Sequence, residues 1–546
     1  MARSSTSLLC FTLFSLLLSH ACFAQIEQMP QRSQRGGQQR QQHRWQSQCQ
    51  FQRLNARQPN RRVECEAGVS EYWDIQNTED DELHCAGVET ARHTIQRRGL
   101  LLPSFLNAPM MFYVIQGNPI IQIIIFIYIY IIIHIIIILL MSINIYMIIP
   151  GRGIHGAVIP GCPETFERGT SSPSSRGYRS EGASSDEQHQ KVREIKEGDM
   201  VAMPAGVADW VYNNGDSPLV LIAFVDVGNQ ANQLDQFSRR FHLAGNPHRE
   251  QKTQQQVRAR SQSRSQLRRE SGEQTPNGNI FSGFDTRILA ESFNVDTELA
   301  HKLQNRDDMR ERIVRVRGED LQIIAPSRIQ EEERRHYSRD NGLEETFCTL
   351  RLRQNIDRPS QADIFNPRGG RLNTLNNYNL PILRFLQLTA ERGVLYKNGM
   401  MAPHFNLDSH SVIYVTRGSA RLQVVDDNGR NVFDGELREG QIFVVPQNFA
   451  VVKKASAQGF EWIAVKTNDN AMRNPLAGKV SAMRAMPDDV LANAFQISRE
   501  QARRLKYGRD EISVFSPSSQ QTRYEKNKVV VCNYYSSGTY TLVWVC

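Results

Sequence analysis

The chain repeats short patterns in the same order, and this repetition constrains its fold more than any other feature. "FYVIQG" at residues 112–117 matches "IYVTRG" at 413–418. "GDMVAMP" at 198–204 matches "GQIFVVP" at 440–446. In each half, short runs of apolar residues are bounded by Gly, Asn, Asp and Pro, which is typical of a β-sandwich or barrel. The sequence therefore predicts two similar β-domains.

Each half also ends in a helical pattern. "LAESFNVDTELAHKL" (289–303) matches "LANAFQISREQARRL" (491–505). Pro487 suits the start of a helix, and Ser498 with Gln501 fits a capping box. The apolar members of the pattern should pack against a neighbour; these are Leu289, Phe293, Leu491 and Phe495.

The first 24 residues have the pattern of a secretory signal peptide. Arg3 is followed by an apolar stretch from Leu8 to Leu18, and Ala24 is a small residue at the expected cleavage point. The mature chain should then enter an oxidising compartment, where disulfides persist. Two of the nine cysteines leave with the signal, and the seven that remain lack tight Cys-x-x-Cys pairs. This spacing favours disulfides over zinc. Because seven is odd, either at least one thiol is free or the sequence contains an error, and the sequence suggests no obvious partner for Cys65.

One long apolar run interrupts the first half. Residues 122–149 hold no Asp, Glu, Lys or Arg and are long enough to span a membrane as a helix. The repeat offers another explanation, because Gly117 matches Gly418 at an offset of 301, whereas Arg152 matches Ser419 at 267. The difference of 34 equals the length of residues 118–151.

We interpret residues 118–151 as an unspliced intron read in frame. Gly-Asn and Pro-Gly at its two ends are compatible with GT and AG splice signals, and removal leaves one glycine codon. The alternatives are a membrane span, which would split a strand-turn-strand unit, and a genuine inserted loop, whose many isoleucines would favour aggregation.

The polar tract at residues 248–279 has almost no large apolar residue and cannot form a core. Residues 25–47 are rich in Gln and Arg, and residues 311–341 are expected to be a hydrophilic linker that ends in the charged stretch "QEEERRHYSRDN". Arginine-rich tracts can bind nucleic acid, but aromatic residues are sparse in these, so we expect solvated loops and no nucleic-acid partner.

The most specific stretch is "NGLEETFCTLRLRQNI" at residues 341–356. It resembles the processing site of the legumin-type 11S globulins, the bicupin seed storage proteins. "CQFQRLNA", "ECEAGVSEYWD" and "GIHGAVIPGCPETFE" also resemble this family. The resemblance covers roughly residues 48–524 apart from the apolar run, and the tail 527–546 departs from the family pattern.

The resemblance implies a mostly β fold of two cupin domains, each a β-jelly roll with a helical extension. The expected divisions are cupin domain 1 with its extension (48–310), cupin domain 2 with its extension (342–510) and a tail (511–546). It also implies cleavage between Asn341 and Gly342 by an asparaginyl endopeptidase. Disulfides map to two pairs, Cys162 with Cys348 and Cys49 with Cys85. The implied products are trimers that pair into hexamers in the protein storage vacuole of the seed.

The cupin metal-binding pattern is incomplete. Many cupins hold a metal with His-x-His, a Glu and a later His. In the second domain His404 fits the first position, but the other three positions hold Asn406, Ser411 and Val451. In the first domain Asp209 stands at the later His position. We therefore expect no metal, no cofactor and no catalytic residue.

The leading hypothesis is a nutrient reservoir that stores nitrogen and is not an enzyme. A metal-dependent cupin enzyme is the first alternative, which stoichiometric metal in the purified protein would support. A membrane-anchored vacuolar binding protein is the second, and it depends wholly on the apolar run.

Overall fold

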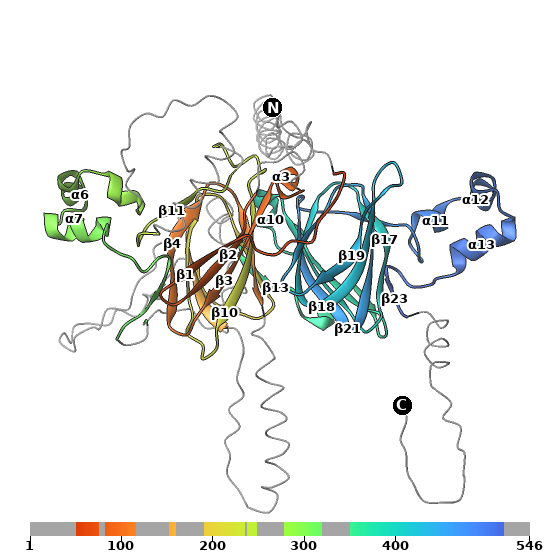
Figure 1. The fold of residues 1–546 in the computed structure, drawn as a ribbon, viewed down its shortest axis with the longest axis horizontal. Coiled ribbons are helices and arrows are strands. Elements are labelled where there is room, and N and C mark those ends of the chain that lie inside the picture. The colour runs from red at the N-terminus through yellow and green to blue at the C-terminus, as the bar shows by residue number, and fades with distance from the viewer. Residues whose placement is uncertain are drawn as a thin grey trace, which may run out of the picture.

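A computed structural model describes residues 51–75, 82–115, 152–159, 191–234, 237–247, 278–318, 321 and 350–517. The signal peptide, the Gln/Arg-rich N-terminus, the apolar run, most of the polar tract 248–279, the processing site and the off-pattern tail lie outside these ranges. Two β-barrels stand side by side, and a group of helices projects from each outer end (Figure 1).

The first barrel is a jelly roll made of two antiparallel sheets. One sheet has the order β1-β2-β3-β10-β5-β8-β13, and the other has the order β11-β4-β9-β6-β7, with β12 paired to β4. The strands are β1 (Arg61–Cys65), β2 (Gly68–Trp73), β3 (Val88–Ile95), β4 (Gly99–Leu106), β5 (Met110–Ile115), β6 (Arg152–Val158), β7 (Lys191–Lys196), β8 (Asp199–Met203), β9 (Ala208–Tyr212), β10 (Leu219–Asp226), β11 (Arg240–His242) and β12 (Ile313–Arg315).

The second barrel repeats this arrangement in one ten-stranded sheet that curls around its core. Its strands are β14 (Ile364–Asn366), β15 (Gly370–Leu375), β16 (Thr389–Leu395), β17 (Met400–Asn406), β18 (Ser411–Val425), β19 (Asn431–Arg438), β20 (Ile442–Val445), β21 (Ala450–Lys466), β22 (Arg473–Pro475) and β23 (Val514–Phe515). The strand β13 (Arg353–Asn355) precedes this barrel in the chain but pairs with β8 of the first barrel.

The strands form because their side chains alternate between the core and the outer face. The β19 strand alternates in this way from Phe433 onward: Phe433, Gly435 and Leu437 are partly or fully buried, whereas Asp434, Glu436 and Arg438 are exposed. Two-residue periodicity of this kind is the pattern of a half-buried strand. The central strand β18 has buried residues at Ala420, Leu422 and Val424, all of which belong to the core of the second barrel.

Short helices complete the two domains. In the first barrel α3 (Glu82–Ala86) follows β2, and the extension contains η3 (Ile280–Gly283), α6 (Thr286–Phe293) and α7 (Thr297–Gln304). In the second, η4 (Pro359–Gln361) and α10 (Leu383–Leu386) lie within the domain, and the extension contains α11 (Ala482–Ala485), α12 (Asp488–Phe495) and α13 (Arg499–Tyr507). Among the described residues, no helix is long and apolar enough to cross a membrane.

The predicted helix starts are confirmed. Pro487 is the N-cap of α12, and Ser498 forms a capping box with Gln501 at the start of α13. Leu289 and Leu491 are buried as expected. Phe293 and Phe495 are about half exposed in the single chain, at 52% and 54%. The Phe293 ring does meet the Phe281 ring edge-on, but the prediction that Phe293 and Phe495 are buried is wrong for the single chain.

Strand pairing confirms the sequence repeat and shows how many extra residues the first barrel has between β5 and β6. Met110 pairs with Met203 just before Pro204, as Ser411 pairs with Val445 just before Pro446. Arg152 pairs with Lys196 two residues before Gly198, as Ser419 pairs with Arg438 two residues before Gly440. The strands β5 and β6 together thus correspond to the single strand β18. Met110 and Arg152 are 42 positions apart and their counterparts 8, which is an excess of 34 residues.

The two barrels share one apolar core at their contact. This cluster includes Phe112, Val201 and Phe224 of the first domain with Leu383, Tyr414 and Val465 of the second. A guanidinium of Arg92 donates to the Tyr414 hydroxyl at 3.0 Å, and the Trp73 ring meets Tyr414 edge-on. Apolar burial of this extent holds the domains in a fixed relation.

A glycine faces a tryptophan across neighbouring strands in both barrels. Gly393 pairs with Trp462, and a Cβ at Gly393 would lie 2.0 Å from the Trp462 ring. Gly156 and Trp210 form the same arrangement in the first barrel. The tryptophan ring therefore covers the position that a side chain would need.

We expect Gly393→Ala to lower the free energy of unfolding by roughly 1–3 kcal/mol, the usual cost of overpacking a filled core. Chemical denaturation of the purified variant measures this. Gly283→Ala is the matched control, because nothing lies within 4 Å of the added Cβ. Equal stability of the two variants would contradict the packing argument.

Candidate functional site

The interior of the second barrel contains the four positions where many cupins place metal ligands. His404 and Asn406 lie on β17, Ser411 begins β18, and Val451 lies on β21 directly opposite His404. All four are buried. The fold therefore brings the positions together, as the sequence pattern predicted, and their chemistry decides whether they can hold a metal.

His404 is the one strong metal ligand among these four residues. Its Nδ1 lies 2.8 Å from the carbonyl oxygen of Ala402. Burial, together with the charges of Lys453 and Arg473, holds the pKa of His404 well below its usual range, so the ring is neutral. Among the described residues, no group of three or more His, Cys, Asp or Glu side chains is placed to hold a metal.

A lysine ammonium already lies against the second ligand position. Lys466 Nζ donates to Asn406 Oδ1 at 3.2 Å and forms an ion pair with Glu391 Oε2 at 2.9 Å. Both charged residues are almost fully buried, at 3% and 2% exposure. A fixed positive charge next to the site disfavours a divalent cation there. The residues present do not fit a cupin metal centre.

The sequence prediction missed the charged residues around this site. Glu391, Lys453 and Lys466 occupy inward positions of strands β16 and β21, and Arg473 lies on β22. A signal for them existed, because charged residues at core-facing positions of an alternating strand are rare unless they are paired. The sequence could not show that Glu391 lies close to the two lysines, since strand pairing brings together residues that are more than 60 positions apart in the chain.

The first barrel contains a different buried pair, His155 and Asp209. The His155 Nε2 and Asp209 Oδ2 atoms are 3.8 Å apart, and the ring of Phe112 meets His155 edge-on. Burial lowers the pKa of His155 to about 3 and raises the pKa of Asp209 to about 6, an increase that nearby Arg240 and Arg312 oppose. Near neutral pH the imidazole is therefore uncharged. Two ligands of this kind are too few for a metal centre.

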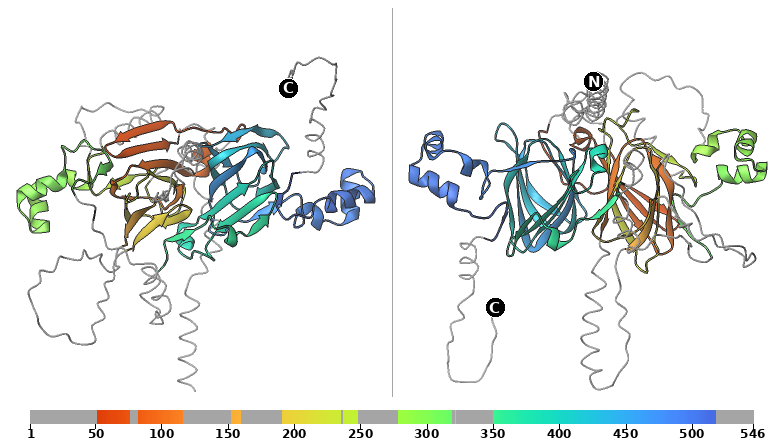
Figure 2. Two further views of the ribbon diagram at one scale, coloured as in Figure 1. Left: turned by 90° about the horizontal axis from the view of Figure 1, so that it is seen from below. Right: turned by 180° about the vertical axis from the view of Figure 1, so that it is seen from behind.

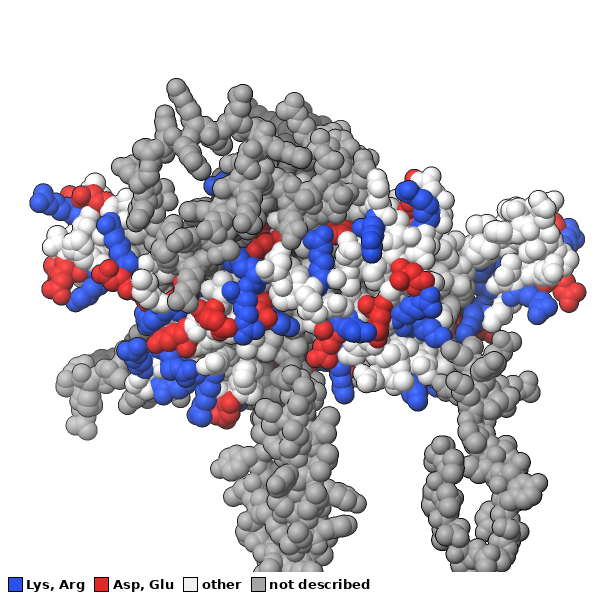
Figure 3. All heavy atoms as spheres, viewed as in Figure 1, with Lys and Arg blue, Asp and Glu red and all other residues white. Residues whose placement is uncertain are grey.

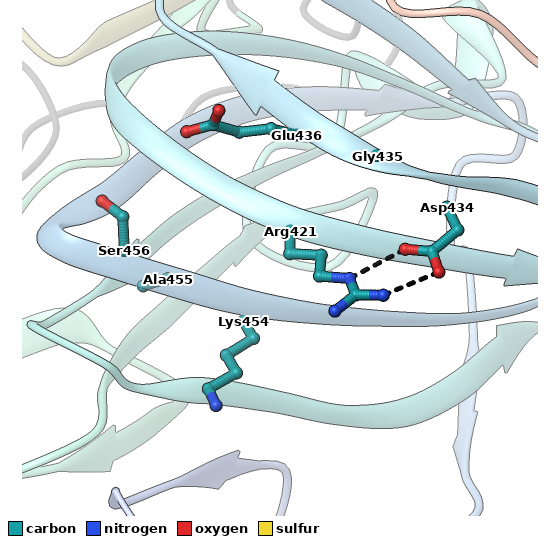
Figure 4. Close-up of a pocket in the computed structure, with 7 residues that line it drawn as sticks. All are labelled: Arg421, Asp434, Gly435, Glu436, Lys454, Ala455 and Ser456. Carbon is teal, nitrogen blue, oxygen red and sulfur yellow. Dashed lines mark hydrogen bonds and ion pairs between the residues drawn. The ribbon is translucent and has the colours of Figure 1, made fainter.

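An open cavity of about 460 Å³ lies on the outer face of the second barrel (Figure 4). The guanidinium of Arg421 makes two hydrogen bonds to Asp434, at 2.8 and 2.7 Å. Ser456 contributes the one hydroxyl group among the described residues that line the cavity, and none of these residues is a histidine that could act as its base. The described lining therefore has no serine–histidine pair. Its lining residues are Arg421, Asp434, Gly435, Glu436, Lys454, Ala455 and Ser456.

The sequence-predicted processing and disulfide residues fall mostly outside the described ranges. Asn341, Gly342, Cys49, Cys162 and Cys348 all lie there. Cys85, on the buried side of α3, is disulfide-bonded.

The raised pKa of Asp209 makes the stability of the first barrel depend on pH. Between pH 4 and 6 the folded carboxyl keeps a proton that the unfolded chain has lost, so this group's contribution to stability falls as pH rises. We expect the free energy of unfolding of Asp209→Asn to equal that of wild type near pH 4 and to be higher by up to about 3 kcal/mol at pH 7. Urea denaturation across this range measures the difference. The control is Asp427→Asn, because Asp427 is exposed. If its stability relative to wild type changes with pH in the same way, the effect does not come from buried Asp209.

The comparisons with known proteins agree with this geometry. The cupin family model matches residues 140–249 and 354–503. The 11S globulin subunit beta of Cucurbita maxima is 47% identical over 534 residues, which cover 96% of this chain and all of that protein. The 11S globulin seed storage protein 1 of Carya illinoinensis is 47% identical and covers 91% of this chain and 95% of that protein.

Solved structures of 11S globulins also match this chain. The crystal structure of pumpkin seed globulin has a TM-score of 0.66 and 45% identity, covering 86% of this chain and 100% of that chain. The recombinant pro-11S globulin of pumpkin has the same TM-score, 46% identity and the same coverage. Two cupin barrels without a complete metal site, and close identity over nearly the whole length, place the chain in one family: it belongs to the legumin-type 11S globulins, the seed storage proteins.

Proposed function

We propose that this chain is a nutrient reservoir of the seed, cleaved between Asn341 and Gly342 and packed as hexamers in the protein storage vacuole. One observation carries the storage role: in the second barrel, Lys466 donates to Asn406 at the place where many cupin enzymes hold their metal. The barrel therefore keeps the cupin fold without the residues of a cupin metal centre. The 11S relatives named above support the same role. An asparaginyl endopeptidase is the proposed protease, and the proposed disulfides are Cys162 with Cys348 and Cys49 with Cys85.

The described strands support two chains that remain joined after cleavage. The strand β13, which follows the proposed cut, pairs with β8, and Arg353 Nη1 lies 2.7 Å from the buried carboxylate of Asp199. Farther along, Arg392 forms ion pairs with Asp357 and Glu461, and Asp357 also accepts a bond from Tyr113 of the first barrel. The second chain would therefore contribute a strand to the first chain's sheet in addition to the proposed disulfide.

The surface supports a soluble reservoir with no nucleic-acid partner. On the face shown in Figure 3, Lys and Arg are interspersed with Asp and Glu over both barrels. Many of these charges are paired, as Arg62 is with Glu64 and Arg438 with Glu436. Mixed charges favour solubility, whereas nucleic-acid binding needs a basic stripe.

The helical extensions support self-association. They project from opposite ends of the molecule and are related by the internal repeat (Figure 2). Each exposes apolar side chains that its own barrel does not cover: Ile288, Phe293 and Leu299 on α6 and α7, and Val490, Phe495 and Leu505 on α12 and α13. Two matching apolar surfaces at opposite ends favour head-to-tail contacts that can close into a ring. We propose that the unprocessed chain forms a trimer in this way.

We expect Phe495→Asp to convert the trimer of the unprocessed protein to monomer, because the charge would be buried in an apolar contact. Sedimentation velocity measures the mass. The control is Tyr378→Asp, which places the same charge on another exposed aromatic residue, at 77% exposure, outside the helices. A trimer that survives Phe495→Asp with unchanged affinity would show that the contact lies elsewhere.

We further propose that residues 118–151 are an unspliced intron and are absent from the accumulated protein. The excess of 34 residues between β5 and β6, relative to β18, supports this, because it equals the length of the segment. The same proposal makes a membrane anchor unnecessary.

Peptide mass spectrometry of the reduced, trypsin-digested protein from its own tissue tests cleavage and splicing together. We expect a peptide that runs from Gly99 to Gln116 and ends in Gly-Arg, and a chain that begins at Gly342. The sequence as given has no tryptic site between Arg98 and Arg152, so it cannot yield that peptide. Peptides from residues 118–151 would overturn the splicing proposal, and an uncut 341–342 bond in mature seed would overturn the processing proposal.

A further inference from the structure

The interior of the second barrel holds more positive than negative charge. Lys453, Lys466 and Arg473 are turned into it together with one fully buried carboxylate, Glu391. The two lysines are each 3% exposed, and the Arg473 side chain is 16% exposed at the rim. Asp408 is half-buried near Lys466, and its Oδ1 accepts from the backbone of Met472. Even with Asp408 included, one positive charge has no counterpart.

The single buried carboxylate is used by two of the cations. Glu391 Oε2 lies 2.9 Å from Lys466 Nζ and 3.5 Å from Arg473 Nε, and Glu391 Oε1 accepts from the indole of Trp462 at 3.4 Å. Lys453 has no carboxylate within ion-pair distance among the described residues. The ion pairs of Glu391 therefore neutralise charge beside Lys466 and Arg473 but not beside Lys453.

Soft groups surround the ammonium of Lys453. Its Nζ lies 3.5 Å from Met401 Sδ and 4.7 Å from the centre of the Trp462 ring. A thioether is a weak acceptor, and an ammonium has three N–H donors. Arg473 Nη1 is also buried, and it has no hydrogen-bond acceptor among the described residues. Two cationic groups thus have donors available in the same interior.

The fold does not require the buried carboxylate or the two lysines, whereas at the position of Arg473 the first barrel also has an arginine, Arg240. The pairing register places Ala91, Val211 and Val225 of the first barrel at the positions of Glu391, Lys453 and Lys466. The first barrel fills these positions with apolar side chains. Because an unpaired buried cation costs several kcal/mol, the two lysines that only the second barrel has, with a single carboxylate between them, call for a compensating partner.

We propose that the interior of the second barrel binds a small monovalent anion, a halide or a short carboxylate, between the ammonium of Lys453 and the guanidinium of Arg473. The anion supplies the missing negative charge and accepts the available N–H donors. Water could accept these hydrogen bonds but would leave the excess charge uncompensated. This binding site is separate from the storage role and does not depend on processing or assembly.

Anion-dependent melting of the full-length protein tests the proposal. The protein is heated in a zwitterionic buffer containing potassium chloride, acetate or the bulky gluconate at equal ionic strength. We expect chloride or acetate at about 100 times its dissociation constant to raise Tm by roughly 5 °C relative to gluconate. Chloride binding is measured directly from the ³⁵Cl NMR linewidth, and acetate binding by calorimetry, so the two sources are distinguished.

Two substitutions on one strand separate the site from general salt effects. Lys453→Met removes the buried charge and fits beside Met401 and Trp462, so we expect it to fold and to lose the anion dependence. Lys454→Met is the matched control, because Lys454 lines the cavity on the outer face of the same strand. Arg473→Gln, at the rim, should weaken anion binding at least tenfold and provides a second test if Lys453→Met fails to fold.

The proposal is overturned if wild type melts at the same temperature in all three salts and neither chloride nor acetate binds, which would mean that water fills the site. It is also overturned if Lys453→Met and Lys454→Met respond alike to the choice of anion.

Discussion

The long antiparallel pairing of β18 with β21 is the constraint on which the rest of the second domain depends. Ser411–Gly418 pair with one end of β21 and Ala420–Val425 with the other, so two continuous strands pass through the whole barrel. The alternation of side chains along them places Val415, Leu422 and Val424 in the core. The same ladder presents Tyr414 to Arg92 and thereby joins the barrels.

This ladder also decides which chemistry the barrel interior can carry. It fixes inward positions but leaves their residue types free, so the second barrel can place Lys453 and Lys466 where the first has Val211 and Val225. Both versions fold because the remaining inward residues fill the core. A cupin barrel can therefore lose its metal ligands, keep its scaffold and serve as a compact store, which needs resistance to unfolding more than a reactive site.

Much of the fold was predictable from the sequence, because its main signals are local or repeated. The strand alternation, the capping box of Ser498 and Gln501 and the order of the repeats depend on short patterns. The exposure of Phe293 and Phe495 was not predictable, since an amphipathic helix shows which face is apolar but not whether the same chain or another copy covers it. The charge cluster was also missed, because Glu391 meets Lys466 only through the register of β16 with β21.

The backbone at the centre of β18 gives a further physical reason to doubt an insertion in the matching part of the first barrel. Gly418 has φ of 72°, and a Cβ there would lie 2.3 Å from the carbonyl oxygen of Gly459. Only glycine suits such a position, where the backbone is left-handed and another strand approaches closely. By the repeat, the first barrel needs one glycine between Gln116 and the residue that matches Ser419, which is Arg152. Removal of the proposed intron leaves one glycine codon at this point, so the spliced chain would meet both the register and the conformational requirement of the ladder.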